Sequence, residues 1–313
     1  MKAAQIKNYG SSEAIEITTD LKKPTPQKGQ VLVQVDAASL NRIDSYFLAG
    51  GLRTWLPMGL PQTLGGDFAG VVTEVGDEVT DFKVGDEVYG NAGVYRGGGS
   101  GSIAEFVIAG SEYTALKPKS LDFTNSSALP LAAASALQGI EEELKVADGQ
   151  KILIQGGAGG IGSLAIQIAK MHGAYVATTV ATNDVEFAKS LGADEVIDYK
   201  TQNVSQILKD FDGVFNTANP VEANKLFPIL KKNGKFVSMA GEPDPELAKQ
   251  YNVVAVGQMT ATNNAQLKRI AELVDSGKLK VYIEKSFPFE NTKEAFVYFE
   301  TKHPRGKIVI NIK

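Results

Sequence analysis

The chain has 313 residues, of which 43 % are hydrophobic and 22 % charged, and its formal net charge at pH 7 is −4. These values are typical of a globular protein with room for two domains, and the acidic balance argues against a nucleic-acid partner. No apolar run approaches the ~20 residues that cross a bilayer, and the N-terminal residues resemble neither a secretory signal nor a transit segment. We therefore expect a cytoplasmic protein with no membrane partner.

Cysteine is absent, and His172 and His303 are the two histidines. The lack of cysteine excludes disulfides, thiolate nucleophiles and cysteine-based zinc sites. Two histidines do not make a multi-histidine metal site, so we expect no metal ion. Any chemistry must come from oxygen-bearing side chains, the backbone or a bound organic cofactor.

The first 110 residues are rich in predicted strands. Apolar runs of strand length, bounded by glycine, proline and acidic residues, cover residues 30–37, 68–75, 83–90 and 103–108. Short strands at such close spacing indicate a compact, barrel-like domain. Beyond Pro118 the pattern changes, and a helical stretch follows from Ala128 to Leu137.

From Lys151 onward, predicted strands alternate with helices. The strands cover residues 151–155, 175–180, 195–198, 213–216, 235–239 and 253–257, and the first helices cover 161–172 and 184–191. This alternation is typical of a doubly wound parallel sheet. Helices at 265–275 and 292–300 and a strand at 307–312 follow once that sheet is complete. The prediction is an α/β fold, with a β-rich substrate domain (1–125, completed by 262–313) and a Rossmann domain (126–261).

A glycine-rich loop carries the argument for a dinucleotide. The strand at 151–155 leads into Gly157, Gly159 and Gly162, and a helix follows, which is the context that this fingerprint requires. The three glycines are expected to permit a tight turn, the approach of the pyrophosphate and close helix–strand packing, respectively. An ordinary glycine-rich turn is the alternative, but the flanking elements favour a cofactor. The expected contact residues are Gly157, Ala158, Gly159, Gly160, Ile161 and Gly162.

The residues at the end of the second predicted strand of the Rossmann domain indicate whether NAD or NADP is bound. NAD enzymes usually place an acid there, on the ribose 2′-hydroxyl, and residues 178–183 contain none. Asp184 comes next and is expected to serve the first turn of the following helix. Hydroxyl and amide groups do not repel a 2′-phosphate, so the sequence favours NADPH, with Thr179, Thr182 and Asn183 as candidate contacts.

With these residues in view, the chain resembles the zinc-independent quinone oxidoreductase branch (zeta-crystallin-like) of the medium-chain dehydrogenase/reductase superfamily. The resemblance covers nearly the whole length, and it implies a GroES-like substrate domain formed by both chain ends, a Rossmann domain between them and an active site in the cleft. The Cys and His-Glu zinc ligands of other branches are missing. The matching segments are 41–46, 64–72, 84–88, 129–130, 156–162, 191–199 and 305–309.

The resemblance also implies roles for individual residues. Tyr199 would lie beside the adenosine 2′-phosphate, and Ser135 matches a Thr or Ser near the nicotinamide. Asn183 stands where many relatives have a Lys that pairs with the 2′-phosphate. We therefore expect NADPH to be preferred by a modest margin.

Asn41, Asp44 and Tyr46 are the candidate catalytic residues. The segment 41–44 could equally be a helix cap, with Asn41 as the N-cap and Asp44 reaching back to its N–H, and Tyr46 could be a half-buried tyrosine with a hydrated hydroxyl. Hydride transfer to a quinone or enone develops negative charge on the carbonyl oxygen, and a phenol hydroxyl is still protonated at neutral pH and can donate to it. Together with the resemblance, this favours a substrate-facing Tyr46.

The predicted function is NADPH-dependent, zinc-independent hydride transfer to quinones or conjugated carbonyl compounds. Reduction of the C=C bond of 2-alkenals or enones is a neighbouring chemistry that the sequence does not separate from it. A non-enzymatic NADPH-binding protein with a structural or sensor role is the alternative from another class, and the missing ligands argue against a zinc alcohol dehydrogenase. The apolar strand at residues 251–256 lies late in the Rossmann order, where an exposed edge predicts a homodimer, as does the resemblance.

Overall fold

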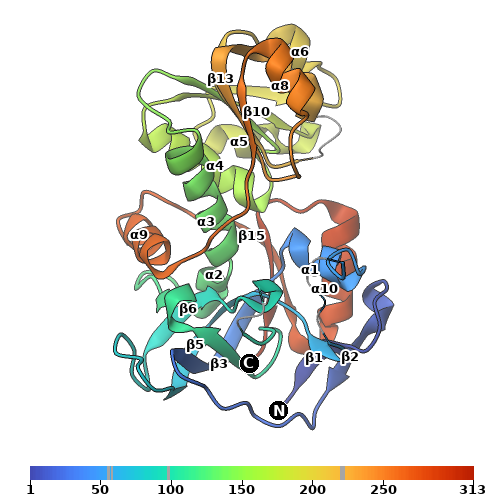
Figure 1. Cartoon of the computed structure of the whole chain (residues 1–313), viewed down its shortest axis with the longest axis vertical. Coiled ribbons are helices and arrows are strands. Elements are labelled where there is room, and N and C mark those ends of the chain that lie inside the picture. Colours follow the sequence, from blue (N-terminus) through green and yellow to red (C-terminus); the bar gives the residue numbers. More distant parts are fainter. Residues whose placement is uncertain (55–56, 58, 97–98, 219–222) are drawn as a thin grey trace. The chain divides into compact units, whose positions relative to one another are not determined.

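The computed structural model describes residues 1–54, 57, 59–96, 99–218 and 223–313, which form two compact units (Figure 1). The first unit comprises Met1–Ala134, Thr262–Gly277 and Val281–Lys313, and the second comprises Ser135–Ala261 with Lys278–Lys280. The first unit thus continues past the expected boundary at residue 125. Its helix α2 (Phe123–Ser127) packs on strands of that unit, which accounts for the extension.

The first unit is built on a seven-stranded sheet in the order β15-β16-β3-β5-β6-β8, with β7 also paired to β3. A smaller sheet has the order β2-β1-β4. The C-terminal strand β16 pairs with β3, so both ends of the chain complete one unit. The strands are β1 (Ala3–Ile6), β2 (Ile15–Thr18), β3 (Gln30–Ser39), β4 (Gln62–Thr63), β5 (Asp67–Val75), β6 (Glu87–Asn91), β7 (Phe106–Gly110), β8 (Thr114–Leu116), β15 (Ile283–Pro288) and β16 (Lys307–Asn311).

Two large apolar clusters make up most of the core of this unit. Val31, Val33 and Val35 alternate along β3 and lie in one cluster, as the period-two geometry of a strand predicts for side chains on one face; Leu32, on the other face, is buried as well. The other cluster joins α1 (Arg42–Leu48) to α10 (Thr292–Lys302), with Phe47 and Phe296 fully buried in it. Helix α9 (Asn264–Asp275) packs against β8.

The second unit is a parallel sheet of six strands in the order β11-β10-β9-β12-β13-β14. Numbered from the first strand of the unit, this is the order 3-2-1-4-5-6 of a Rossmann fold, which confirms the predicted fold class. The strands are β9 (Lys151–Gln155), β10 (Tyr175–Val180), β11 (Glu195–Asp198), β12 (Phe211–Asn216), β13 (Leu230–Ser238) and β14 (Val254–Gly257). The helices are α4 (Gly160–Met171), α5 (Val185–Ser190), α6 (Val204–Ile207) and α8 (Pro245–Tyr251).

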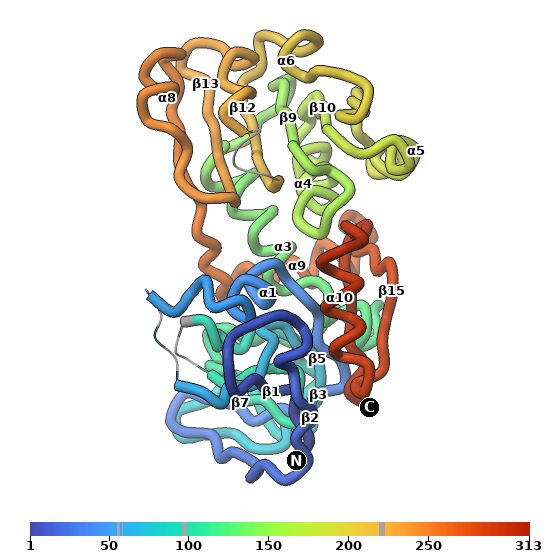
Figure 2. Tube along the Cα trace, turned by 90° about the vertical axis from the view of Figure 1, so that its right-hand side faces the viewer, coloured from blue at the N-terminus to red at the C-terminus, as the bar shows by residue number. Residues whose placement is uncertain are grey.

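Helix α4 packs beside β9 and β10 (Figure 2), and the order of the strands reverses between β9 and β12. Helix α3 (Pro130–Leu137) continues into a π-helical segment, η4 (Gln138–Glu143). Ligands of doubly wound sheets bind outside the carboxyl ends of the strands, near such a reversal. The loop that follows β9 is therefore the first to consider, together with the segments at the carboxyl ends of the other strands.

Two strands of the first unit begin later than predicted. The run at residues 83–90 becomes a strand only at Glu87, because Gly85 has a φ of 93° and the Asp86 carboxylate accepts the Lys83 N–H, which makes a turn. The run at 103–108 becomes β7 only at Phe106. Within the described residues, no helix is both long and apolar enough to cross a bilayer.

Candidate functional site

The loop from Gly156 to Gly159 joins β9 to α4. Gly156 has a φ of 84°, in the left-handed region that glycine adopts readily, so the tight turn that we expected at Gly157 is made at Gly156. A Cβ on Gly157 would lie 2.1 Å from Thr178 Oγ1, so this glycine is required for packing against β10. A Cβ on Gly162 would lie 2.2 Å from the Gly156 carbonyl oxygen, so Gly162 lets α4 approach the loop.

Gly159 differs from these glycines. It is the N-cap of α4 with a φ of −76°, and a Cβ there would meet only the Gly156 carbonyl oxygen, at an ordinary contact distance of 3.5 Å. Neither the backbone nor the packing of the protein therefore requires glycine at this position. The neighbouring Ala158, Gly160 and Ile161 are half-buried. The free space at Gly159 and the N–H groups at the start of α4 fit a pyrophosphate.

The threonines at the end of β10 are engaged within the protein. Thr178 Oγ1 donates to the Ile154 carbonyl (2.6 Å), and Thr182 Oγ1 donates to Asp198 (2.7 Å). Thr179 is buried, and its hydroxyl accepts the Gly156 N–H (3.2 Å). Of the other candidate contacts, Asn183 is exposed and Tyr199 is 54 % exposed.

Asp198, the last residue of β11, is an acidic residue near these threonines that the sequence did not lead us to consider as a cofactor contact. One carboxylate oxygen accepts the Thr182 hydroxyl and the other accepts the Lys200 N–H (2.9 Å). These hydrogen bonds, that of Thr182 first, lower the pKa of Asp198 below its ordinary value. The carboxylate is ionised and braces the turn after β11. The sequence did place Asp198 at the carboxyl end of a predicted strand, and that position could have identified it as a residue near the cofactor.

Ser135 lies in a buried polar cluster of the second unit. Its hydroxyl is 2.6 Å from that of Thr260, and its carbonyl accepts a hydrogen bond from Gln258 Nε2 (3.0 Å). Gln138 Oε1 accepts the Ala261 N–H (3.1 Å), which ties η4 to the segment after β14. Sequence reasoning singled out Ser135 but missed Gln258 and Thr260, although both directly follow the carboxyl end of the last strand.

In the first unit, Asn41 is the N-cap of α1, and the carboxylate of Asp44 accepts its N–H (2.6 Å). The other oxygen of Asp44 accepts the hydroxyl of buried Tyr95 (2.6 Å). Asp44 is fully buried, and this burial raises its pKa to about 7, against the effect of its two hydrogen bonds. The helix cap that was weighed against a catalytic role is therefore present.

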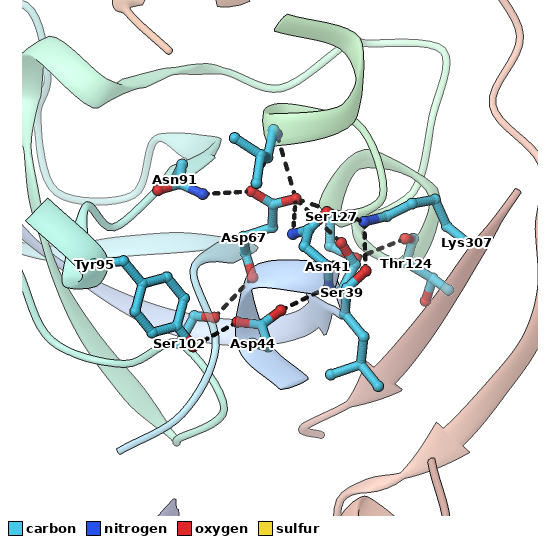
Figure 3. A network of polar contacts seen from close by, with 12 residues as sticks. Ser39, Asn41, Asp44, Asp67, Asn91, Tyr95, Ser102, Thr124, Ser127 and Lys307 are labelled. Atoms are coloured by element: carbon cyan, nitrogen blue, oxygen red, sulfur yellow. Dashed lines mark hydrogen bonds and ion pairs between the residues drawn. The ribbon is translucent and has the colours of Figure 1, made fainter. Parts of the chain in front are cut away.

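Asp67, at the start of β5, is the centre of a larger buried network (Figure 3). Its carboxylate accepts hydrogen bonds from the side chains of Asn41 and Asn91 (2.8 Å each) and from the N–H of Leu131 at the start of α3 (3.1 Å). Lys307 Nζ lies 3.8 Å from Asp67 and donates to Asn41 Oδ1 (2.5 Å). Asn41 therefore bridges the two buried charges. Burial raises the pKa of Asp67 and lowers that of Lys307.

Tyr46 lies on the opposite, solvent-facing side of α1 and is 56 % exposed. A Cβ on Gly51 would lie 2.3 Å from the Tyr46 ring, so the ring packs against Gly51 in space that any other residue's side chain would occupy. Asn41 and Asp44 are enclosed and engaged in the network at the start of the same helix. Of the three predicted catalytic side chains, Tyr46 alone is accessible.

Within the described part of the chain, no group of three or more His, Cys, Asp or Glu residues could hold a metal ion. The resemblance places the zinc ligands of other branches near Asn41 and at Gly66-Asp67; in this chain Asn41 and Asp67 instead bond to each other within the buried network.

The sequence matches two known families. Residues 27–119 match the Alcohol dehydrogenase GroES-like domain, and residues 191–310 match the family described as Zinc-binding dehydrogenase. The chain is 35 % identical to the chloroplastic NADPH-dependent alkenal/one oxidoreductase of Arabidopsis thaliana, over 99 % of this chain and 79 % of that protein. It is 31 % identical to the chloroplastic quinone-oxidoreductase QR1 of Triphysaria versicolor, over 99 % of this chain and 98 % of that protein.

A solved structure shares the whole fold. The quinone oxidoreductase from Coxiella burnetii superposes with a TM-score of 0.90 at 32 % sequence identity, covering 100 % of this chain and 99 % of that one.

Proposed function

Because the chain belongs to the zinc-independent branch of the medium-chain dehydrogenase/reductase superfamily, with quinone and alkenal oxidoreductases among its homologues, we propose that it is an NADPH-dependent oxidoreductase. Its substrates are quinones or conjugated carbonyl compounds. The observation that carries this proposal is the glycine loop on the first strand of the 3-2-1-4-5-6 sheet, with free space at Gly159 that the packing of the protein does not explain.

A bound nicotinamide supplies the hydride. The loop from Gly157 to Gly162 holds the pyrophosphate through backbone N–H groups, and Ser135, fixed by Thr260, contributes to the nicotinamide pocket. Tyr46 donates a hydrogen bond to the substrate carbonyl oxygen as negative charge develops there, and its exposure supports that role.

Asn41 and Asp44 act through Tyr46 and do not contact the substrate. Both are buried, and both bond to protein groups at the first turn of the helix that carries Tyr46. We therefore propose them as positioning residues. A catalytic role, which the sequence left open, would require an accessible polar atom on at least one of them.

Oxidation of NADPH, followed against a panel of 1,4-quinones, enones and 2-alkenals, tests the proposal. We expect turnover of at least one electrophile class. The comparison also separates quinone reduction from C=C reduction, which the 35 % identity to an alkenal/one oxidoreductase keeps as a second candidate. Binding of NADPH with no turnover of any class would favour a sensor or structural role.

We further propose a homodimer formed through β14. This strand ends the sheet order and pairs with β13, and Val254 on it is 61 % exposed. An exposed apolar edge favours strand pairing with a second copy. Light scattering at micromolar concentration should give twice the monomer mass, and Val254→Lys should shift the protein to monomer.

The proposed compartment is the cytoplasm. The Arabidopsis thaliana and Triphysaria versicolor relatives are chloroplastic by name, and a mitochondrial NAD(P)H oxidoreductase of Bos taurus is 33 % identical. Imaging of a C-terminally tagged chain in its own cells tests the assignment, which localisation in an organelle would overturn.

A further inference from the structure

Recognition of a 2′-phosphate needs donors that are not already used within the protein. At the end of β10, the hydroxyls of Thr178 and Thr182 donate to the Ile154 carbonyl and to Asp198, respectively. Thr179 is buried and accepts the Gly156 N–H. The threonines proposed from the sequence are therefore poor candidates, and a charged donor would bind phosphate more strongly than any hydroxyl.

The basic residues of the second unit leave few candidates for a charged donor to the 2′-phosphate. The sequence of this unit contains no arginine, so a permanently charged donor supplied by this unit would be a lysine. Lys200 follows the carboxyl end of β11 by two residues, and no other lysine in the sequence of the unit follows a strand within four residues. Two lysines on the neighbouring helices α4 and α5 form ion pairs, since Lys170 pairs with Asp194 and Lys189 pairs with Glu186.

The fold brings Lys200 to the end of β10. The Tyr199 N–H donates to the Val180 carbonyl (3.1 Å), and the Thr182 hydroxyl bonds Asp198, so the turn after β11 is tied twice to the segment that ends β10. That segment follows the second strand of the fold, where dinucleotide-binding proteins read the adenosine ribose. Lys200 Nζ lies over the exposed ring of Tyr199, 5.1 Å from its centroid. This cation–π contact holds the ammonium group beside an aromatic face at the solvent boundary.

We propose that Lys200, held on the ring of Tyr199, recognises the 2′-phosphate of NADPH and thereby supplies the charge missing at Asn183. The inference rests on the proposed function and names the residue that sets its cofactor preference. The ammonium donates a charge-assisted hydrogen bond to the phosphate. Asp198 lies in the same turn, and its negative charge interacts with Lys200 and opposes the phosphate, which keeps the preference modest.

Calorimetric binding of two nucleotides that differ only in the 2′-phosphate tests the proposal without turnover. The probes are adenosine 2′,5′-bisphosphate and 5′-AMP. Lys200→Gln should weaken binding of the bisphosphate by ~10- to 100-fold, the loss of one hydrogen bond to a charged group, and leave 5′-AMP unchanged. Lys200→Arg, which keeps the charge, should retain most of the bisphosphate affinity.

Lys189→Gln is the matched control, because it removes the same charge from an exposed lysine of α5 in the same unit. This control should not change the ratio of the two affinities. An unchanged ratio in Lys200→Gln, or an equal change in the control, would overturn the assignment of Lys200 and leave the proposed function intact. If the unmodified protein bound neither probe nor NADPH, the proposed function itself would fail.

Discussion

The carboxylate of Asp67 and the ammonium group of Lys307 lie 3.8 Å apart, and the exposures of their side chains are only 0 % and 4 %. Asn41 joins them, donating to Asp67 and accepting from Lys307. The cap of the helix that carries Tyr46 is thus fixed by a buried charge pair. Such a pair adds little when it is replaced as a whole but costs a great deal when it is broken.

Breaking that pair should destabilise the first unit. Lys307→Met leaves Asp67 buried without its counter-charge and should cost ~3–5 kcal/mol in unfolding free energy, whereas Asp67→Asn with Lys307→Met should cost less than the sum of the two single changes. Lys313→Met is the control, because Lys313 forms an exposed pair with Asp36 and its loss should cost at most ~1 kcal/mol. Urea unfolding of the four variants measures this, and strictly additive losses would contradict it.

Asp44 should make stability depend on pH. Its folded-state pKa is about 7, against an ordinary value of 3.8, so the folded protein keeps a proton that the unfolded chain has released. Its contribution is fully present below pH 3.8, declines with a slope approaching ~1.4 kcal/mol per pH unit, and is lost above pH 7. Asp44→Asn should flatten the difference in unfolding free energy between pH 5 and pH 8. An identical pH profile for the two proteins would refute the assignment.

The glycine loop offers a test that separates fold from ligand. Gly159→Ala places a methyl group in free space, so the protein should fold normally and bind NADPH at least ~10-fold more weakly. Gly162→Ala brings a Cβ to 2.2 Å from the Gly156 carbonyl oxygen and should lower the melting temperature instead. Melting curves and NADPH titrations of both variants distinguish an effect on folding from an effect on cofactor binding. If Gly159→Ala bound NADPH as tightly as the unmodified protein, the proposal that the pyrophosphate binds at Gly159 would be wrong.

The sequence predicted the strands of the second unit best. Those at 151–155, 175–180 and 195–198 have the bounds of β9, β10 and β11, because each is a short apolar run with clear ends. The sequence did not predict the left-handed conformation of Gly156, because adjacent glycines are interchangeable by composition.

The sequence also did not predict which side chains of distant segments bond to each other. Asp67 and Lys307 stood within matched segments, but nothing in the pattern paired them, and Asn41 was considered as a catalytic residue or a local cap, not as a link between two buried charges. The hydroxyl of Thr182 was expected to be available to a ligand, yet it donates to Asp198 at the end of the neighbouring strand β11. Such pairing is decided by tertiary structure, which a single sequence does not show.

Tyr46→Phe tests the proposed donor. Loss of the hydroxyl should lower kcat by ~10- to 1000-fold, the scale of a lost oxyanion donor, with little change in NADPH affinity. Tyr175→Phe is the matched control, since Tyr175 is a partly exposed tyrosine of the second unit whose hydroxyl bonds Glu195. An unaltered kcat in Tyr46→Phe, under conditions in which hydride transfer limits the rate, would reduce Tyr46 to a packing residue.

The central claim is zinc-independent hydride transfer from NADPH to an electrophilic carbonyl compound. Its most direct test is the rate of NADPH oxidation with a 1,4-quinone and with a simple enone, measured before and after exhaustive chelation, with the zinc content of the protein determined in parallel. We predict turnover of at least one electrophile, an unchanged rate after chelation and well under one zinc ion per chain. Stoichiometric zinc, with turnover that chelation abolishes and zinc restores, would contradict the claim.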